Sequence, residues 1–340
     1  MTPDKLKPND PRVQSLKASV RGKTYHYLLG KPADGVPIGT VLLVHGFPDF
    51  SFGWRYQVPM FLSMNLQVVV PDMIGYAGTD APEDLTAYSL KSVSDDMAEL
   101  VGQICPGEQI ILGGHDWGGF FVWRMVHWHP DLVRAVFSVC TPYRPPAKEY
   151  IDGETMTKRL PNFRYQLQFA GPDVEREIKG RERTEQFLRG IYGGRGPAGE
   201  LVMSTAKGIL FENLDKLGPS PLVNDEELKF YVDAFAPRGL RGPLNWYRTR
   251  EINYQEEQAL FGEDGKASKV NAPSLLILAE NDKALPPAMA NGMEKFFDDL
   301  TKKQVDAHHW ALWEAAEEVN AIIREFLGKV LQPATVKASI

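Results

Sequence analysis

The sequence predicts an α/β fold with a mostly parallel sheet that is interrupted by a helical insertion. Three observations support this prediction. In the first half of the chain, short apolar runs alternate with longer stretches of helical spacing. These runs end at glycine, proline or polar turns, as the buried strands of a parallel sheet do. The strand pattern then disappears between residues 144 and 247 and returns near residue 273.

The first half supplies four expected strands and two expected helices. The strands are runs of β-branched and aliphatic residues at 41–44, 67–70, 109–112 and 135–139. The helical patterns span 90–105 and 118–129, and Pro130 follows the second as a stop signal. This β-α-β alternation predicts right-handed crossovers between parallel strands.

The middle of the chain is charged, rich in helix formers, and without a long apolar strand. A strand pattern returns at 273–279 and weakly at 303–306, and a last helix is expected over 315–331. We therefore expect a sheet core formed by residues 1–143 and 248–340, and a helical cap formed by residues 144–247. The glycine-rich segment 190–199 lacks the Gly-Lys-Ser/Thr ending of a phosphate loop, so we expect a surface loop there.

The composition is that of a globular chain with a substantial core. Of the 340 residues, 43% are apolar and 24% are charged, which excludes a disordered, collagen-like or coiled-coil protein. The net charge is −6, and no stripe of lysine and arginine stands out. Nucleic acid and anionic membranes are therefore poor candidates as partners.

Three features favour a cytoplasmic protein. The beginning of the chain carries charges and prolines where a signal peptide needs an apolar run. No stretch approaches the roughly 18 apolar residues of a membrane span. The two cysteines, Cys105 and Cys140, cannot form a disulfide framework, which favours a reducing compartment, although a single bridge between them stays open.

The segment after the expected strand 109–112 is the strongest candidate for a catalytic turn. Residues 113–119 read Gly-Gly-His-Asp-Trp-Gly-Gly, and a helix is expected next. Small residues around a central one, between strand and helix, are typical of a nucleophile elbow. The central residue is Asp116, at a helix N-terminus that favours negative charge. A simple helix cap is the alternative for such an aspartate, and the flanking glycine pairs argue against it.

An aspartate at this position changes the chemistry that a serine would perform. A carboxylate is a weak nucleophile toward amides, but it can displace a leaving group from an sp³ carbon and form an alkyl ester. Water must then hydrolyse the ester at the carbonyl carbon of Asp116. This second step needs a base that works near pH 7, and histidine suits that purpose best.

Two adjacent histidines are the candidates for this base. His308 and His309 follow the last weak strand, at the carboxyl edge of the sheet where α/β sites form. Asp282 follows the strand at 273–279 and is the expected orienting carboxylate, with Glu280 as the alternative. The other histidines are His26, His45, His115, His127 and His129. His26 lies in an expected strand, and His127 and His129 lie two apart on one expected helix, where a histidine is more often structural than catalytic.

Two backbone N–H groups are expected to stabilise the oxyanion that forms when water attacks the ester. One belongs to Trp117, directly after the nucleophile. The other belongs to Phe47, in the loop after the strand at 41–44. Pro48 has no N–H but can fix this loop, with a cis bond as one means. An ordinary glycine-proline turn is the alternative for the loop.

Together these motifs resemble the soluble epoxide hydrolases of the α/β-hydrolase fold, over nearly the whole chain. The family's nucleophile, orienting acid and base fall on Asp116, Asp282 and His309, in the chain order of the α/β-hydrolase triad. The segments that carry the resemblance are His45–Pro48, Ser51–Gln57, Asp72–Tyr76, Gly114–Gly119, Ala279–Asp282 and His309-Trp310.

Two segments of the insertion extend the resemblance, Phe163–Phe169 and Arg241–Arg248. They place the family's cap tyrosines at Tyr165 and Tyr247. Opening an epoxide produces a basic alkoxide, and a phenol with a pKa of about 10 can give it a proton or a strong hydrogen bond. A halide needs no proton, which separates epoxide hydrolases from haloalkane dehalogenases that share the aspartate.

The resemblance implies an enzyme that converts small apolar epoxides and water to vicinal diols, as in detoxification, without a metal or organic cofactor. A haloalkane dehalogenase-like hydrolase is the near alternative, and a binding protein that has lost the chemistry is the distant one. The sequence departs from the family at His308, where glycine is frequent, and at Ala77. Asp72 also matches a family position, and we expect it to hydrogen-bond within a turn. The oligomeric state is left open.

Overall fold

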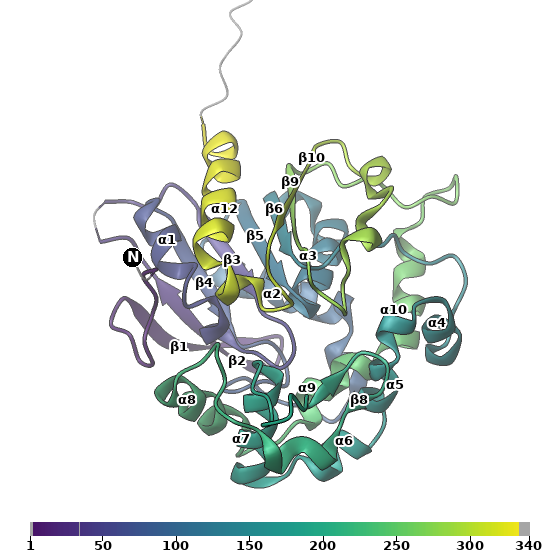
Figure 1. The fold of residues 1–340 in the computed structure, drawn as a ribbon. Coiled ribbons are helices and arrows are strands. Elements are labelled where there is room, and N and C mark those ends of the chain that lie inside the picture. The colour runs from purple at the N-terminus through teal and green to yellow at the C-terminus, as the bar shows by residue number, and fades with distance from the viewer. Residues whose placement is uncertain (1–2, 34, 333–340) are drawn as a thin grey trace, which may run out of the picture.

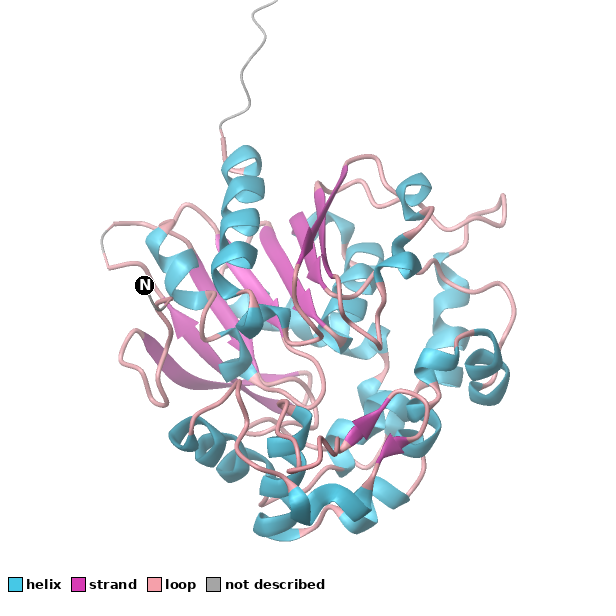
Figure 2. Cartoon of the chain, viewed as in Figure 1, coloured by secondary structure: helices cyan, strands magenta, loops and turns pink. Residues whose placement is uncertain are grey.

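The computed structural model describes residues 3–33 and 35–332. Eight strands form one sheet in the order β1-β2-β4-β3-β5-β6-β9-β10 (Figure 2). Strands β3, β4, β5, β6, β9 and β10 run parallel, and β2, next to the edge strand β1, is antiparallel to both of its neighbours, β1 and β4. The mostly parallel sheet is confirmed. The strands are β1 Val13–Val20, β2 Lys23–Gly30, β3 Thr40–Val44, β4 Gln67–Pro71, β5 Ile110–His115, β6 Val133–Val139, β9 Ser274–Ala279 and β10 Leu300–Val305.

Helices cover both faces of this sheet. Helices α1 and α12 lie on one face, and α2 and α3 lie on the other (Figure 1). Because both faces are covered, β3, β4, β5 and β9 are buried at every position, and β6 at every position except Arg134. The α-helices are α1 Val58–Ser63, α2 Leu90–Ile104, α3 Trp117–Trp128, α4 Gly153–Arg159, α5 Tyr165–Ala170, α6 Asp173–Glu177, α7 Gly180–Ile191, α8 Asp225–Phe235, α9 Arg241–Asn245, α10 Arg250–Glu257, α11 Ala311–Glu314 and α12 Ala316–Val330.

The segment between β6 and β9 forms helices α4 to α10 and the short strands β7 (Met203–Ser204) and β8 (Gly208–Ile209). Most of these helices gather along one side of the sheet, in teal and green in the lower half of Figure 1. The short 3₁₀ helix η6 (Trp246–Arg248) follows α9 in this segment. The chain boundaries of core and cap, at residues 144 and 247, stay a prediction.

The register of the sheet brings distant loops together. Val44 of β3 pairs with Gly114 of β5, and His115 pairs with Val139 of β6. On the other side of β6, Val139 pairs with Ile277 of β9. The strands are parallel, so the loops that follow β3, β5, β6, β9 and β10 all leave from one edge. The candidate residues of the site lie in these loops.

Two further expectations can be compared with the fold. Cys105 and Cys140 are both free and buried, so the disulfide that the sequence left open does not form. Within the ranges 3–33 and 35–332, none of the helices combines the length and apolar composition that a bilayer crossing requires.

Candidate active site

Asp116 occupies a strained turn between β5 and α3. Its φ of 54° lies in the left-handed region, which a residue with a side chain rarely adopts. A Cβ atom on Gly114 would collide with the backbone of Gly118, and one on Gly118 would collide with the carbonyl of Val44. The turn is therefore tight enough to require glycine on both sides of Asp116, as the sequence pattern predicted.

His309 lies between two carboxylates. Its Nδ1 is 2.7 Å from Oδ2 of Asp282, and its Nε2 is 3.5 Å from Oδ2 of Asp116. The other oxygen of Asp282 accepts hydrogen bonds from the N–H groups of Ala284 and Leu285, at 2.8 and 2.9 Å. Asp282 is thus fixed on its backbone side and presents one oxygen to the imidazole.

The charges of Asp116, His309 and Asp282 shift the pKa values of one another. Burial alone would raise the pKa of Asp116, but the hydrogen bond and charge of His309 hold it below its usual value. Burial would lower the pKa of His309, but the negative charge of Asp282 and the hydrogen bond to Asp116 raise it well above 6.5. The pKa of Asp282 is likewise lowered, against its burial, by the charge of His309. These directions favour an imidazolium between two carboxylates in the resting site.

The geometry separates the alternatives that the sequence left open. His308 is exposed, and its Nδ1 is 2.9 Å from Oε2 of Glu314, away from Asp116. Glu280 is also exposed, and its neighbour Asp282 contacts the imidazole instead. His309 and Asp282 are therefore the members of each pair that the fold brings to Asp116.

The loop after β3 presents a backbone donor to Asp116. The N–H of Phe47 donates to Oδ1 of Asp116 at 2.7 Å. The Phe47–Pro48 peptide bond is cis. Trp117 is the first residue of α3, so its N–H has no partner within the helix. Tyr192, directly after α7, donates its hydroxyl hydrogen to the carbonyl of Pro48 at 2.6 Å, which ties this loop to the insertion.

Tyr165 and Tyr247 lie with Asp116 on the wall of one cavity. Tyr165 begins α5, Tyr247 lies in η6, and their ring centroids are 6.3 Å apart. Burial raises the pKa of both phenols, and the negative charge of Asp116 raises it further. Both phenols therefore keep their protons at neutral pH. The ring of Tyr247 also packs edge-on against Phe47 and Trp117, with centroids 5.3 and 5.2 Å away.

The cavity is large enough for a small organic molecule. Its volume is about 360 Å³, and most of its lining surface is apolar. Trp117, Phe120, Phe163 and Trp246 contribute aromatic surface. A pocket of this size and composition is typical of a binding site for an apolar ligand with a few polar groups.

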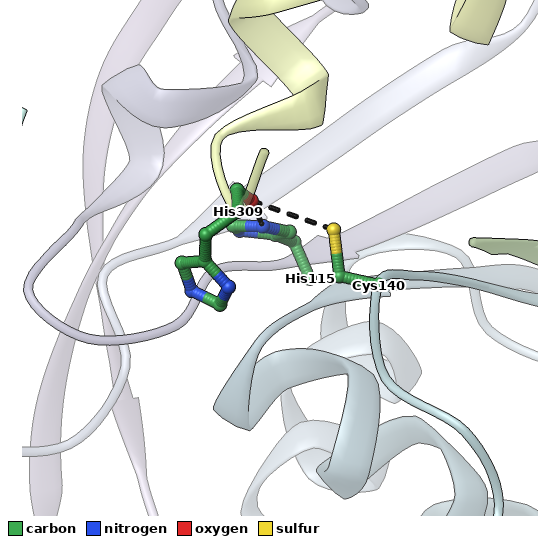
Figure 3. Close-up of side chains that lie close together, drawn as sticks. All are labelled: His115, Cys140 and His309. Atoms are coloured by element: carbon green, nitrogen blue, oxygen red, sulfur yellow. Dashed lines mark hydrogen bonds between the residues drawn. The ribbon is translucent and has the colours of Figure 1, made fainter. Parts of the chain in front are cut away.

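The sequence did not predict any role for His115 and Cys140 beside this site. Nε2 of His115 and Sγ of Cys140 both donate to the backbone carbonyl of His309, at 2.8 and 3.4 Å (Figure 3). The positions of these residues, one before Asp116 and one directly after β6, were the available signal. Together they fix the backbone from which the His309 imidazole projects.

His115, Cys140 and His309 are residue types that bind metal ions, but their protonation here does not suit a metal ligand. Ligand atoms of His115, Cys140 and His309 lie within 4.8 Å of one another. A zinc ion would need a thiolate and free ring nitrogens. Burial raises the pKa of the Cys140 thiol well above 9, and both donors already bind the His309 carbonyl. The arrangement therefore fits a hydrogen-bonded support better than a ligand set.

Other histidines and Asp72 have structural partners, as expected. Asp72 accepts hydrogen bonds from the N–H groups of Ser51 and Gly78 and lies 2.6 Å from Nδ1 of His26. His45 binds the carbonyl of Gly46 and the N–H of Met73. His127 contacts the Tyr143 hydroxyl, and His129 contacts Asp95.

Comparison with known proteins shows the fold class of this chain and the enzyme family to which it belongs. A family model for the alpha/beta hydrolase fold matches residues 39–316. The chain is 41% identical to epoxide hydrolase srdG of Neurospora crassa, over 97% of this chain and 100% of that protein. It belongs to the epoxide hydrolases of the α/β-hydrolase fold.

Two more distant relatives agree with this assignment. The chain is 33% identical to bifunctional epoxide hydrolase 2 of Sus scrofa, over 84% of this chain and 51% of that protein, so it spans about half of that relative. The crystal structure of epoxide hydrolase A from Mycobacterium thermoresistibile superimposes with a TM-score of 0.77 at 27% identity, over 93% of this chain and 98% of that one.

Proposed function

We propose that this protein converts epoxides to vicinal diols through a covalent ester on Asp116. The observation that carries the proposal is the shared cavity of one carboxylate and two protonated phenols, Asp116 with Tyr165 and Tyr247. A carboxylate can attack a ring carbon while a phenol supplies hydrogen bonds or a proton to the ring oxygen. A halide leaving group would not need the two phenols.

In the first step, Oδ2 of Asp116 attacks a carbon of the epoxide ring. The C–O bond of the ring breaks, and its electron pair stays on the ring oxygen. Tyr165 and Tyr247 hydrogen-bond to this oxygen, and one of the two phenols gives it a proton. The phenolate regains a proton as the His309 imidazolium loses its own, because esterified Asp116 no longer carries the charge that held it. The product of the step is a hydroxyalkyl ester of Asp116.

In the second step, His309 removes a proton from water, and the resulting hydroxide attacks the carbonyl carbon of the ester. The negative charge then develops on Oδ1, which already accepts the N–H of Phe47 at 2.7 Å. The N–H of Trp117 is the second donor that we propose. Collapse of the tetrahedral intermediate breaks the bond between the carbonyl carbon and the alkyl oxygen. The leaving oxygen takes the proton of the new Asp116 carboxyl group, so the diol is neutral. His309 keeps the proton from water, which restores the imidazolium and the carboxylate.

Asp282 has a supporting role in this scheme. It binds Nδ1 of His309 and so directs Nε2 toward the ester. No metal or organic cofactor takes part in either step, and the reactants are a small apolar epoxide and water. The cytoplasmic location that the sequence favours remains part of the proposal.

The test is intact-protein mass spectrometry with a simple aryl epoxide such as styrene oxide. His309→Gln should gain the mass of one epoxide because the ester forms but is not hydrolysed. Asp116→Ala and the double variant should gain no mass, and Asp116→Ala should form no diol. Diol formation by Asp116→Ala together with an unmodified His309→Gln protein would replace the covalent scheme by direct attack of water.

A further inference from the structure

The proposed reaction does not use the glycine-rich segment 190–199, which the sequence led us to expect as a surface loop. Only the second part of this segment is a surface loop. Residues 197–199 are exposed, whereas Gly190, Tyr192 and Gly194 are buried. The first part therefore packs inside the protein, where it can contact the site.

Helix α7 ends inside this segment, at Ile191. Gly193 has a φ of 89°, in the left-handed region that favours glycine. The N–H of Gly193 donates to the carbonyl of Gly190, and the N–H of Gly194 donates to the carbonyl of Arg189. These two bonds form a Schellman motif, which fixes the backbone at the helix end. Neither bond uses the carbonyl of Ile191, so this carbonyl is open to a partner from outside the helix.

Trp310, the residue after His309, is this partner. Its indole N–H donates to the carbonyl of Ile191 at 2.9 Å. The ring of Tyr192 packs edge-on against the indole, with centroids 5.0 Å apart and an angle of 82° between the planes. On its own side, the indole stacks on Trp313 at 4.4 Å. The end of α7 therefore holds the loop that carries His309.

The hydroxyl of Tyr192 contacts a second loop of the site. It donates to the carbonyl of Pro48 at 2.6 Å, and the side chain is fully buried. Burial raises the pKa of Tyr192 well above 10, and the charge of Asp49 raises it further, so the phenol keeps its proton and stays a donor. Pro48 follows Phe47, whose N–H donates to Oδ1 of Asp116 at 2.7 Å. Two adjacent residues at the end of α7 thus contact both the loop of the base and the loop of the oxyanion donor.

The two steps of the reaction affect the hydrogen bond from Phe47 in opposite directions. When Asp116 attacks the epoxide, negative charge leaves the carboxylate, so the hydrogen bond to Oδ1 becomes weaker. When water attacks the ester, negative charge returns to Oδ1, and the bond becomes stronger. Only an interaction that strengthens in the transition state accelerates a step. A displaced Phe47 N–H should therefore slow hydrolysis of the ester and spare its formation.

We propose that the end of α7 positions the groups of the hydrolysis step, and that Tyr192 is the positioning residue that holds the Phe47 N–H at Oδ1 of Asp116. The carbonyl of Ile191 holds Trp310 in the loop of the base. The insertion then orients groups for the second step, besides carrying the two tyrosines that act in the first. This inference rests on the proposed epoxide hydrolysis and adds a positioning residue to it.

Rapid quench with styrene oxide, followed by intact-protein mass spectrometry, measures formation and hydrolysis of the ester separately. Tyr192→Phe should lower the rate constant of hydrolysis about 10-fold, because the oxyanion donor is displaced; removing such a donor outright costs about 100- to 1,000-fold. Ester formation should stay within about threefold of the wild type. The ester should therefore accumulate in the steady state of this variant.

Tyr88→Phe is the matched control. Tyr88 is as buried as Tyr192, and its hydroxyl donates to the carbonyl of Pro82 at 2.9 Å, away from the cavity wall. Both variants should lose stability, since each leaves a proline carbonyl without its donor. Tyr88→Phe should nevertheless change neither rate constant, which separates a positioning role from a general loss of stability.

Equal slowing of both steps by Tyr192→Phe, or hydrolysis at the wild-type rate, would overturn the inference. Trp310→Phe keeps the test open if Tyr192→Phe does not fold. It removes the indole donor to Ile191 and should also slow hydrolysis more than formation, and an equal effect on the two steps would count against the role of α7. These outcomes are distinct from failure of the proposed function, in which the wild type forms no diol and His309→Gln forms no adduct.

Discussion

The backbone N–H of Phe47 and the Asp116 carboxylate are joined by a hydrogen bond of 2.7 Å to Oδ1, and Oδ2 is left to face His309 at 3.5 Å. The two oxygens of one carboxylate therefore have different surroundings. Oδ1 is held by a backbone donor of the loop after β3. Among the described residues, Oδ2 accepts from no backbone N–H, which makes it the better placed oxygen for attack on a ligand.

This difference predicts where the oxygen of water goes. Water attacks the carbonyl carbon of the ester, so its oxygen should enter the Asp116 carboxylate, and the oxygen in the diol should come from Asp116. In a single turnover with excess enzyme in H₂¹⁸O, the peptide that contains Asp116 should gain the label and the diol should remain unlabelled. Label in the diol after the first turnover, with none in the peptide, would contradict the covalent scheme.

A second prediction concerns the cavity tyrosines. Tyr165→Phe and Tyr247→Phe should each lower kcat for epoxide opening about 10- to 100-fold, because each removes a hydrogen bond to a developing alkoxide. The double variant should lose the activity almost completely. Alkylation by a haloalkane, where it occurs at all, should not fall. Tyr254→Phe is the matched control, since this tyrosine also lines the cavity and its hydroxyl contacts the carbonyl of Lys148.

A third prediction follows from the charges around His309. In the free enzyme, Asp282 and Asp116 raise its pKa well above 6.5, so the imidazole is protonated and cannot act as a base. Forming the ester removes the charge of Asp116 and the hydrogen bond to it. The pKa of His309 should then fall, and the base becomes available only after the first step has occurred.

Rapid-quench measurements across pH can test this order of events. The rate of ester hydrolysis should rise with an apparent pKa below the value at which His309 titrates in the free enzyme. In NMR titrations, Asp116→Asn should mimic the neutral ester and lower the pKa of His309. An unchanged pKa of His309 in Asp116→Asn would contradict this order of events.

The raised pKa of His309 also affects the stability of the fold. It stabilises the folded state below pH 6.5, and this contribution is lost as the pH rises through the pKa of His309 in the folded protein.

The inner strands and the turn at Asp116 could be predicted because each depends on residues that are adjacent in the sequence. Strands covered on both faces are mostly apolar, as 41–44 and 68–70 are. The glycines around Asp116 are required by backbone contacts that a Cβ atom would prevent. The edge strand β10 gave only a weak signal because exposed polar residues, Lys302 and Lys303 among them, occupy its centre. Its observed start at Leu300 lies before the expected one.

Other features depend on the tertiary structure and leave no local pattern. His308 and His309 are adjacent, and only the path of the chain after β10 shows which one meets Asp282. The support of the His309 carbonyl by His115 and Cys140 joins three loops that are far apart in sequence.

The last prediction concerns Asp49, which follows the loop of Phe47. It is fully buried; Oδ1 accepts from the Tyr231 hydroxyl and the N–H of Phe50, and Oδ2 has no partner among the described residues. Burial raises the pKa of Asp49 from 3.8 to about 7. Between these pH values the folded protein holds more protons than the unfolded one, so stability should fall as the pH rises through this window.

Asp49→Asn should therefore raise the melting temperature at pH 8 and have a much smaller effect at pH 4, where the carboxyl is neutral in the folded state and only partly ionised in the unfolded state. The gain at pH 8 should reach at most about 4 kcal/mol, since each pKa unit corresponds to about 1.4 kcal/mol. Thermal unfolding followed by circular dichroism at both pH values measures it, with the exposed Asp299→Asn as control. A lower melting temperature of Asp49→Asn at pH 8 would show that the charged carboxylate stabilises the fold through Tyr231 and Arg55. In that case the direction of the pKa shift assigned here to burial would be wrong.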